Sequence, residues 1–345
     1  TVGVDLSAPQ ITITDPGDYI NKSDVVIGWT FNDLSGIEYF EVRLKNSTWD
    51  SGWINVGTYT SYTFTSLTEG SYTVYVRGVD LAGNVGVSSK TFIVDLTPPT
   101  VSISNPPNDS WTTQYSFNVS WTASDNYELG QYKVFLNGSE VESDVLTGTS
   151  VSKTSEILVS SDGHYNITVA VWDGAGNSDS DSIIIHVDST KPDITITKPT
   201  NGSTVGTTFL VQWSATDNMK VTQVDVYLNG SLNTTYYYDS SSITGSHKFE
   251  GLEVDVDYNV TVVAYDAAGN WDRSYVIVHT SPLYVNIYYP DNYDAFNRTW
   301  VMVNWTYEVA TNFEVYANGT LVGTTTDSWY NVTNLDEGLW NITVI

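Results

Sequence analysis

Four tryptophans divide the chain into copies of one sequence unit. Trp29, Trp121, Trp213 and Trp305 follow one another at intervals of 92 residues, and the letters around them are alike: VIGWTFND, NVSWTASD, LVQWSATD and MVNWTYEV. A fixed period of this length is typical of tandem domains, each of which buries its own core. The repeat therefore restricts the fold to an array of small domains.

A second motif occurs late in the first three copies. The segments EGSYTVYVRGVDLAGN, DGHYNITVAVWDGAGN and DVDYNVTVVAYDAAGN place Tyr72, Tyr165 and Tyr258 93 residues apart. An Asp followed by a Pro-containing linker separates these copies. Four domains are predicted: residues 1–97, 98–190, 191–281 and 282–345, the last incomplete at its C-terminal end.

Within each copy, short runs alternate between apolar and polar residues, and Gly, Asn, Asp and Pro separate the runs, as expected for strands and turns. The Asn-Gly pairs at Asn137, Asn229 and Asn318 are strong hairpin signals. The predicted fold class is all-β, with tandem immunoglobulin-like β-sandwiches in an extended string. The Trp is expected on strand B or C, packed between the sheets, and the Tyr near the start of strand F.

Three motifs together resemble a known family. They are Asp-x-[Ser/Thr]-x-Pro at the start of a domain, Trp-[Ser/Thr]-x-x-Asp, and Asp-x-Ala-Gly-Asn. They resemble the tandem bacterial Ig-like domains of large surface adhesins, whose archaeal counterparts occur in envelope proteins. The resemblance covers the whole chain and implies an extended extracellular string of domains. The fourth copy departs from the pattern, because it lacks the linker Asp, the Asp after the Trp and the Asp-x-Ala-Gly-Asn turn.

Composition excludes several classes of function. The chain has 13 Lys and Arg against 40 Asp and Glu, a formal net charge of -27, which argues against nucleic acid and anionic membrane surfaces as partners. It has no Cys, so disulfides and thiolate chemistry are impossible. Its apolar runs are strand-sized, so no membrane insertion is expected. The four His residues form no catalytic motif, and we predict that the chain is not an enzyme.

The two ends of the chain suggest how it is embedded in a larger assembly. Residues 1–4 resemble the tail of the last strand of a preceding domain, because TVGVDL aligns with TFIVDL at residues 91–96. One interpretation is a segment of a longer array. The other is that strand addition from another copy completes the fourth domain, which would give a head-to-tail filament.

Acidic residues recur at three fixed places in the first three copies. These are the linker, the loop after the strand that contains the repeated Trp (the Trp strand), and the turn after the strand that contains the repeated Tyr (the Tyr strand). In an Ig-like domain these segments meet at one end, so their oxygens suit a hard cation such as Ca²⁺. The alternative is that Asp and Asn only cap their own turns. The candidate ligands are Asp5, Asp33, Asp80 and Asn84; Asp95, Asp125, Asp173 and Asn177; and Asp188, Asp217, Asp266 and Asn270.

Sequons for N-linked glycosylation are abundant. Of 27 Asn residues, 15 begin an Asn-x-[Ser/Thr] tripeptide, which predicts dense N-glycans and an extracellular location. Asn-Gly turns and outward Thr residues can also generate sequons without any glycan. The candidate sites are Asn21, Asn46, Asn108, Asn118, Asn137, Asn166, Asn201, Asn229, Asn233, Asn259, Asn297, Asn304, Asn318, Asn331 and Asn341.

These features predict a non-catalytic structural protein of the cell surface. It would be a subunit of a filament, sheath or surface layer, with copies of itself or other envelope proteins as partners. The alternative is a spacer stalk or a carbohydrate-binding segment of a large surface adhesin, with glycans as partners. For that alternative, the candidate sugar-stacking aromatics are Trp49, Trp53 and the run 236–238.

Overall fold

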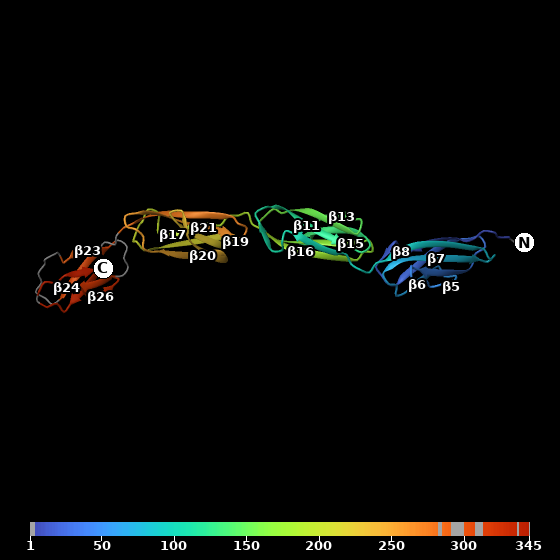
Figure 1. The fold of residues 1–345 in the computed structure, drawn as a ribbon, viewed down its shortest axis with the longest axis horizontal. Coiled ribbons are helices and arrows are strands. Elements are labelled where there is room, and N and C mark those ends of the chain that lie inside the picture. Colours follow the sequence, from blue (N-terminus) through green and yellow to red (C-terminus); the bar gives the residue numbers. More distant parts are fainter. Residues whose placement is uncertain (1–3, 282–284, 291–299, 308–312, 337, 345) are drawn as a thin grey trace. The chain divides into compact units, whose positions relative to one another are not determined.

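The computed structural model describes residues 4–281, 285–290, 300–307, 313–336 and 338–344, and Asn297 lies outside this range. Every regular element among the described residues is a β-strand (Figure 1). No helix there is long and apolar enough to cross a membrane. The chain forms two compact units, Thr1–Val187 and Asp188–Ile345, and each unit contains two of the sequence copies.

The first copy folds into two facing sheets. One has the strand order β1-β3-β6 and the other β2-β8-β7-β4-β5, which is the arrangement of an Ig-like sandwich. The buried Trp29 lies on β3 and its ring packs edge-on against Phe40 of β4, with ring centroids 5.6 Å apart. The strands are β1 (Gln10–Asp15), β2 (Tyr19–Ile20), β3 (Val25–Asn32), β4 (Ile37–Lys45), β5 (Ile54–Gly57), β6 (Ser61–Phe64), β7 (Gly70–Asp80) and β8 (Val85–Val94).

The second copy repeats this topology. Its sheets have the orders β14-β11-β9 and β10-β16-β15-β12-β13, and Trp121 on β11 is fully buried. The strands are β9 (Thr100–Asn105), β10 (Ser110–Thr112), β11 (Ser116–Ser124), β12 (Leu129–Leu136), β13 (Ser139–Val145), β14 (Ser150–Leu158), β15 (Gly163–Asp173) and β16 (Ser178–Val187).

In the third copy, two long strands, β19 and β20, connect all six strands into one hydrogen-bonded sheet with the order β17-β19-β21-β22-β18 and β20 paired with β19. β19 pairs with β17 and β20 along its first half and with β21 and β20 along its second half. Trp213 lies on the first half and is buried. The strands are β17 (Asp193–Lys198), β18 (Thr204–Val205), β19 (Phe209–Leu228), β20 (Ser231–Phe249), β21 (Asp257–Asp266) and β22 (Trp271–Thr280).

The described part of the fourth copy has two three-stranded sheets, β23-β24-β27 and β26-β25-β28. Trp305 on β24 is buried and contacts Phe313, as Trp29 contacts Phe40 in the first copy. The strands are β23 (Val285–Tyr289), β24 (Trp300–Tyr307), β25 (Phe313–Ala317), β26 (Thr320–Thr325), β27 (Trp329–Thr333) and β28 (Ile342–Val344).

Alternation along the strands determines which side chains form the cores. On β7, for example, Tyr72, Val74 and Val76 are buried, whereas the residues between them are partly exposed, because successive side chains of a strand point to opposite faces. Tyr72 donates its hydroxyl hydrogen to the carbonyl of Thr68 at 3.0 Å, and Tyr165 does the same to Ser161 at 2.7 Å. This corner contact is typical of Ig-like domains. The all-β, tandem Ig-like fold class is confirmed.

The Asn-Gly hairpins are also confirmed. Asn137, Asn229 and Asn318 have φ angles of 49°, 48° and 53°, and the Gly after each also has positive φ. Two consecutive residues with positive φ define the type I′ turn, which matches the twist of the flanking strands.

Candidate metal centres and glycosylation sites

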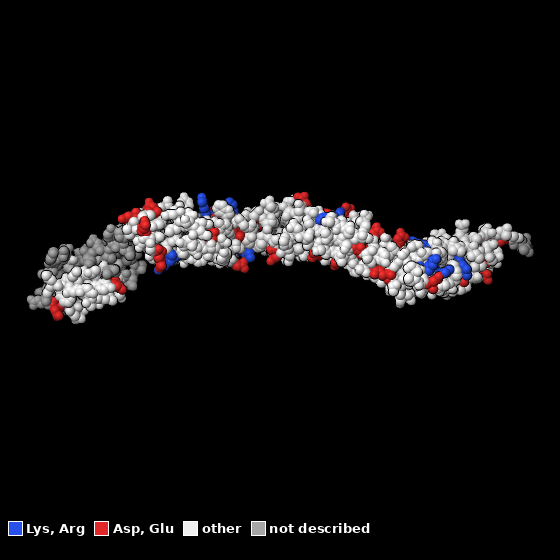
Figure 2. Space-filling view, in the orientation of Figure 1, with Lys and Arg blue, Asp and Glu red and all other residues white. Residues whose placement is uncertain are grey.

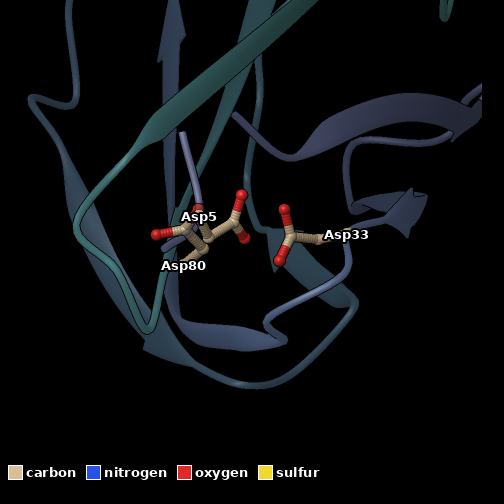
Figure 3. Close-up of side chains that lie close together, drawn as sticks. All are labelled: Asp5, Asp33 and Asp80. Atoms are coloured by element: carbon tan, nitrogen blue, oxygen red, sulfur yellow. The ribbon is translucent and has the colours of Figure 1, made fainter. Parts of the chain in front are cut away.

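Three segments of the first domain bring an Asp to the same place. Asp5 precedes β1, Asp33 follows β3, and Asp80 is the last residue of β7. One carboxylate oxygen from each lies within 4.8 Å of the others, and Figure 3 shows the carboxyl groups of Asp5, Asp33 and Asp80 grouped together. We call this group the first acidic cluster.

The same convergence occurs in the next two domains. The second acidic cluster is Asp95, Asp125 and Asp173, and the third is Asp188, Asp217 and Asp266. In both, one oxygen from each residue lies within 4.8 Å of the others. The linker, the loop after the Trp strand and the turn after the Tyr strand therefore meet in all three domains, as their order in an Ig-like sandwich requires.

One oxygen of each loop Asp caps its own turn. Oδ1 of Asp33 accepts hydrogen bonds from the backbone amides of Ser35 and Gly36, both at 2.9 Å. Oδ1 of Asp125 accepts from the amides two and three residues later, at 2.8 and 3.0 Å, and Oδ1 of Asp217 does the same at 2.8 Å. The turn-capping interpretation is therefore correct for this oxygen.

The second carboxylate oxygen, Oδ2, of these loop residues and of two linker Asp residues is different. It is buried and has no hydrogen-bond partner among the described residues at Asp5, Asp33, Asp95, Asp125 and Asp217. A buried carboxylate oxygen without a partner is costly, because it loses its hydration and gains nothing in return. Turn capping accounts for Oδ1 and leaves Oδ2 unexplained.

The second cluster has a strongly shifted carboxyl group. Asp95 is fully buried, and this burial raises its pKa to about 7; a hydrogen bond with Glu69 and the charges of Asp125 and Asp173 add to the rise. Like charges held together in a poorly solvated place favour the protonated form of one of them.

In the other two clusters the shifted carboxyl group belongs to the Asp at the end of the strand that contains the repeated Tyr, and the two shifts have opposite directions. Burial would raise the pKa of Asp80, but hydrogen bonds from the side chain and amide of Asn84 and from the amide of Ala82 outweigh it and lower the pKa below the usual range. In the third cluster, burial raises the pKa of Asp266 in spite of hydrogen bonds from Asn270. The shared motif therefore does not give a shared electrostatic environment.

The Asn that closes each turn supports the cluster through its amide nitrogen. Nδ2 of Asn84 donates to Oδ2 of Asp80 at 2.8 Å and to the backbone carbonyl of Asp5 at 3.3 Å. Asn177 makes the corresponding bonds at 2.7 and 3.0 Å, and Asn270 at 2.6 and 2.9 Å. These contacts tie the linker to the turn, and a direct ligand role for the three Asn stays a prediction.

No sequence motif predicted a role for Glu69, a residue of the first domain that contacts the linker of the second. Its Oε1 accepts from the linker amides of Leu96 and Thr97, both at 3.1 Å, and from Nδ2 of Asn126 at 3.2 Å. The hydroxyl of Tyr19 in the first domain also donates to Glu128 in the second, at 2.7 Å. These polar contacts join two domains across a long sequence separation, and the repeat pattern contains no signal for them.

The first and second clusters receive no compensating cation from the residues that the structure describes. None of the ion pairs among the described residues includes any of their six Asp side chains. Figure 2 shows Asp and Glu over the visible face and few Lys and Arg. In each of these two clusters three carboxylates converge, and two of them have a buried Oδ2 without a partner among the described residues. This arrangement fits a hard divalent cation such as Ca²⁺, which takes 6 to 8 oxygens.

The sequon asparagines lie at the surface. Of the 14 within the described residues, 12 are exposed, and only Asn46 and Asn304 are partly buried. Six of the 14 also cap a neighbouring backbone amide through Oδ1; Asn137, for example, accepts from the amide of Asn166 at 2.8 Å. The other five are Asn46, Asn108, Asn201, Asn229 and Asn318. A glycan is attached to Nδ2, so this capping is compatible with glycosylation.

The candidate sugar-stacking aromatics are used in different ways. Trp49 is 46% exposed and Tyr237 is 79% exposed. The guanidinium carbon of Arg77 lies 4.4 Å from the ring centroid of Trp53, so this cation covers one face of the indole. Tyr236 and Tyr238 pack against the core of the third domain. The structure therefore gives Trp53 and two of the three tyrosines packing partners within the protein.

Comparison with known proteins agrees with the fold. Residues 192–262 match the sequence profile of the bacterial Ig domain. Over 186 residues the chain is 34% identical to chitinase A1 of Niallia circulans, and the match covers 51% of this chain and 25% of that protein. It is 28% identical over 357 residues to a Kelch domain-containing protein of Saccharolobus solfataricus, covering 98% of this chain and 44% of that protein. The chain thus spans less than half of the length of these relatives.

Among solved structures, the chain is similar to a tetra-tandem repeat from the extending region of a large adhesion protein. The two are 23% identical, with a TM-score of 0.34, and the match covers 96% of this chain and 91% of the other. The resemblance to tandem bacterial Ig-like domains is confirmed by the profile match and the observed sandwiches.

Proposed function

We propose that this array of tandem bacterial-type Ig-like domains is a non-catalytic structural protein of the cell exterior. It would be a subunit of a filament, sheath or surface layer, stabilised by Ca²⁺ at the N-terminal ends of its domains and coated with N-linked glycans. The observation that carries this proposal is the acidic cluster, in which one carboxylate oxygen from each of three Asp residues lies within 4.8 Å of the others. Among the described residues, the buried Oδ2 atoms of Asp5, Asp33, Asp95, Asp125 and Asp217 have no hydrogen-bond partner.

Calcium would act by joining three separate segments of the chain at one point. In the second cluster, Asp95 is in the linker, Asp125 is in the loop after β11, and Asp173 ends β15. An ion bound by all three would fix the linker to the sandwich and neutralise their mutual repulsion. Since the linker also contacts Glu69 of the first domain, the bound ion would restrict the hinge between these two domains.

Glycans would protect the exposed strands. Exposed sequons such as Asn166 on β15 and Asn259 on β21 lie on sheet faces rather than only at turns. Sugar at these positions would cover the face and hinder edge-to-edge association. Dense glycosylation in turn requires an extracellular location.

Three measurements test the proposal. Equilibrium dialysis of the full chain should find three Ca²⁺ ions, one for each cluster, and peptide mass spectrometry of native material should find glycans on most exposed sequons. Electron microscopy of the native envelope fraction should then show filaments or a lattice. Absence of bound Ca²⁺ together with unmodified sequons would refute the proposal.

The similarity to chitinase A1, and to exoglucanase B of Cellulomonas fimi at 26% identity over 294 residues, favours a second candidate. In this alternative, the domains are a spacer or a carbohydrate-binding segment of a larger surface protein. Isolated stalks that end in another domain, seen in the same micrographs, would support the spacer. Saturable binding to an immobilised polysaccharide, lost in Trp49→Ala with the fold intact, would support the carbohydrate-binding segment.

A further inference from the structure

We propose that His164 and His186 of the second domain bind a divalent transition-metal ion of the Cu²⁺, Ni²⁺ or Zn²⁺ class. The two residues lie directly opposite each other on the antiparallel strands β15 and β16. Directly opposite side chains extend from the same face of a sheet, and the two Nδ1 atoms are in hydrogen-bond contact. This pair is separate from the acidic clusters and consists of nitrogen donors.

The carboxylate of Asp109 determines which nitrogen of His186 is available to a metal ion. Nε2 of His186 lies 2.6 Å from Oδ1 of Asp109. An ionised carboxylate only accepts hydrogen bonds, so Nε2 carries the hydrogen, and in the neutral ring the lone pair is on Nδ1. That lone pair is directed at Nδ1 of His164. The same carboxylate contact orients the imidazole ligands of metal sites and increases their basicity.

The surroundings hold one ring firmly and leave the other accessible. The His186 side chain is 12% exposed, and the centroid of its ring lies 4.6 Å from that of Trp111. His164 is exposed, so an ion can reach the pair from solvent. When the ion binds, the hydrogen on Nδ1 of His164 moves to Nε2 through solvent, and both Nδ1 lone pairs then face the metal.

Imidazole nitrogen determines the class of ion. It is a good ligand for Cu²⁺, Ni²⁺ and Zn²⁺ and a poor one for Ca²⁺, and Cu²⁺ binds most tightly in this series. Water would complete the coordination. The net charge of -27 also increases the local concentration of cations around the protein.

The third domain provides a natural control. The corresponding strands there place Asp257 opposite His279, with Nδ1 of His279 2.8 Å from a carboxylate oxygen of Asp257. One imidazole and its hydrogen-bonded carboxylate take the place of two facing imidazoles. This pair is therefore expected to bind Cu²⁺ much more weakly.

The test is a titration of the full chain with Cu²⁺ in saturating Ca²⁺. Tryptophan fluorescence and electron paramagnetic resonance detect the bound Cu²⁺. Trp111 lies beside His186, so a bound Cu²⁺ should quench its emission, and the resonance spectrum should show two coordinated nitrogens. His164→Asn should weaken binding at least tenfold, whereas the matched variant His279→Asn should leave it unchanged. Asp109→Asn should weaken it about tenfold with the two-nitrogen spectrum retained.

Trp111→Phe separates the optical signal from binding, because it should remove the quenching and preserve the resonance signal. His164 is exposed, so its replacement should leave the melting temperature of the chain unchanged. The proposal is wrong if the wild-type chain shows no two-nitrogen Cu²⁺ signal, or if folded His164→Asn binds Cu²⁺ as tightly as the wild type.

Discussion

The first and second acidic clusters have the same geometry in different surroundings. Each has three Asp residues with an oxygen within 4.8 Å of the others. In the second cluster the pKa of Asp95 is raised to about 7 by burial, whereas in the first the pKa of Asp80 is lowered because hydrogen bonds from Asn84 outweigh its burial. Glu69, a residue of the preceding domain, adds to the rise in the pKa of Asp95 and also contacts the linker of the second domain.

This comparison separates what the repeat determines from what the neighbouring domain determines. The repeat fixes where the carboxylates lie, because strand ends and turns are local features of each sandwich. The charge around them depends on side chains from outside the repeat. Ion affinity should therefore differ between clusters that have identical motifs.

Removal of Ca²⁺ should have the largest effect. An ion that binds only the folded state stabilises it by about 2.7 kcal/mol at a concentration 100 times its Kd, which corresponds to roughly 15 °C in the melting temperature of a domain of this size. Calorimetry of the full chain in Ca²⁺ and in EDTA measures this shift. Mg²⁺ at the same concentration is the control, and identical melting in Ca²⁺ and EDTA would contradict the calcium proposal.

The second prediction concerns Asp125→Asn and its counterpart Asp33→Asn. The Asn carbonyl can keep the turn cap, while one negative charge leaves the cluster. In EDTA each variant should therefore be more stable than the wild type by about 1 kcal/mol, since like-charge repulsion is reduced. In Ca²⁺ each should be less stable, since a ligand is lost. Thermal melting in both conditions tests whether the change in stability reverses its sign. A change of the same sign in EDTA and in Ca²⁺ would mean that Asp125 and Asp33 only cap their turns.

The sequence was sufficient for the fold and for the convergence of the Asp residues. The Trp period, the alternation and the Asn-Gly pairs are local signals, and the structure has the corresponding sandwiches and I′ turns. Once the fold is known, its topology also places Asp33 after the strand that contains Trp29 and Asp80 at the end of the strand that contains Tyr72.

The sequence was not sufficient for contacts that depend on tertiary packing. Glu69 accepts hydrogen bonds from the linker and from Asn126 of the second domain. His164 meets His186 only because of the register of β15 and β16. Neither pair is close in sequence, and neither belongs to a repeated motif. For Asp125, the sequence could not assign separate tasks to its two oxygens, because that depends on which of them the turn uses.

The third prediction isolates the neighbouring domain. Glu69→Gln keeps an oxygen acceptor for the amides of Leu96 and Thr97 and removes one negative charge beside Asp95. Calcium binding to the second cluster should weaken roughly tenfold, as is usual when a residue that supports metal ligands is changed, and the first cluster should be unaffected. Isothermal titration of the wild type and variant resolves the sites. Equal loss at both clusters would show that the effect is not local.

The smallest effect should be a pH dependence that differs between the two domains in EDTA. The folded pKa of Asp95 is raised above its unfolded value, so its contribution to stability is fully present below about pH 4 and is lost as the pH rises through about 7. Lowering the pH from 8 to 6 should therefore stabilise the second domain by at most about 1 kcal/mol, after allowance for solvent screening.

The stability of the first domain should depend on pH in the opposite direction, and only below this pH range. The pKa of Asp80 is lowered by its hydrogen bonds, so its contribution is present above the unfolded pKa and is lost only as the pH falls through the lower folded value. Between pH 8 and 6 its stability should not change on this account. Hydrogen exchange, which reports each domain separately, measures both. Asp95→Asn is the control, because it should abolish the dependence in the second domain, and a dependence that survives in this variant would assign the titration to another group.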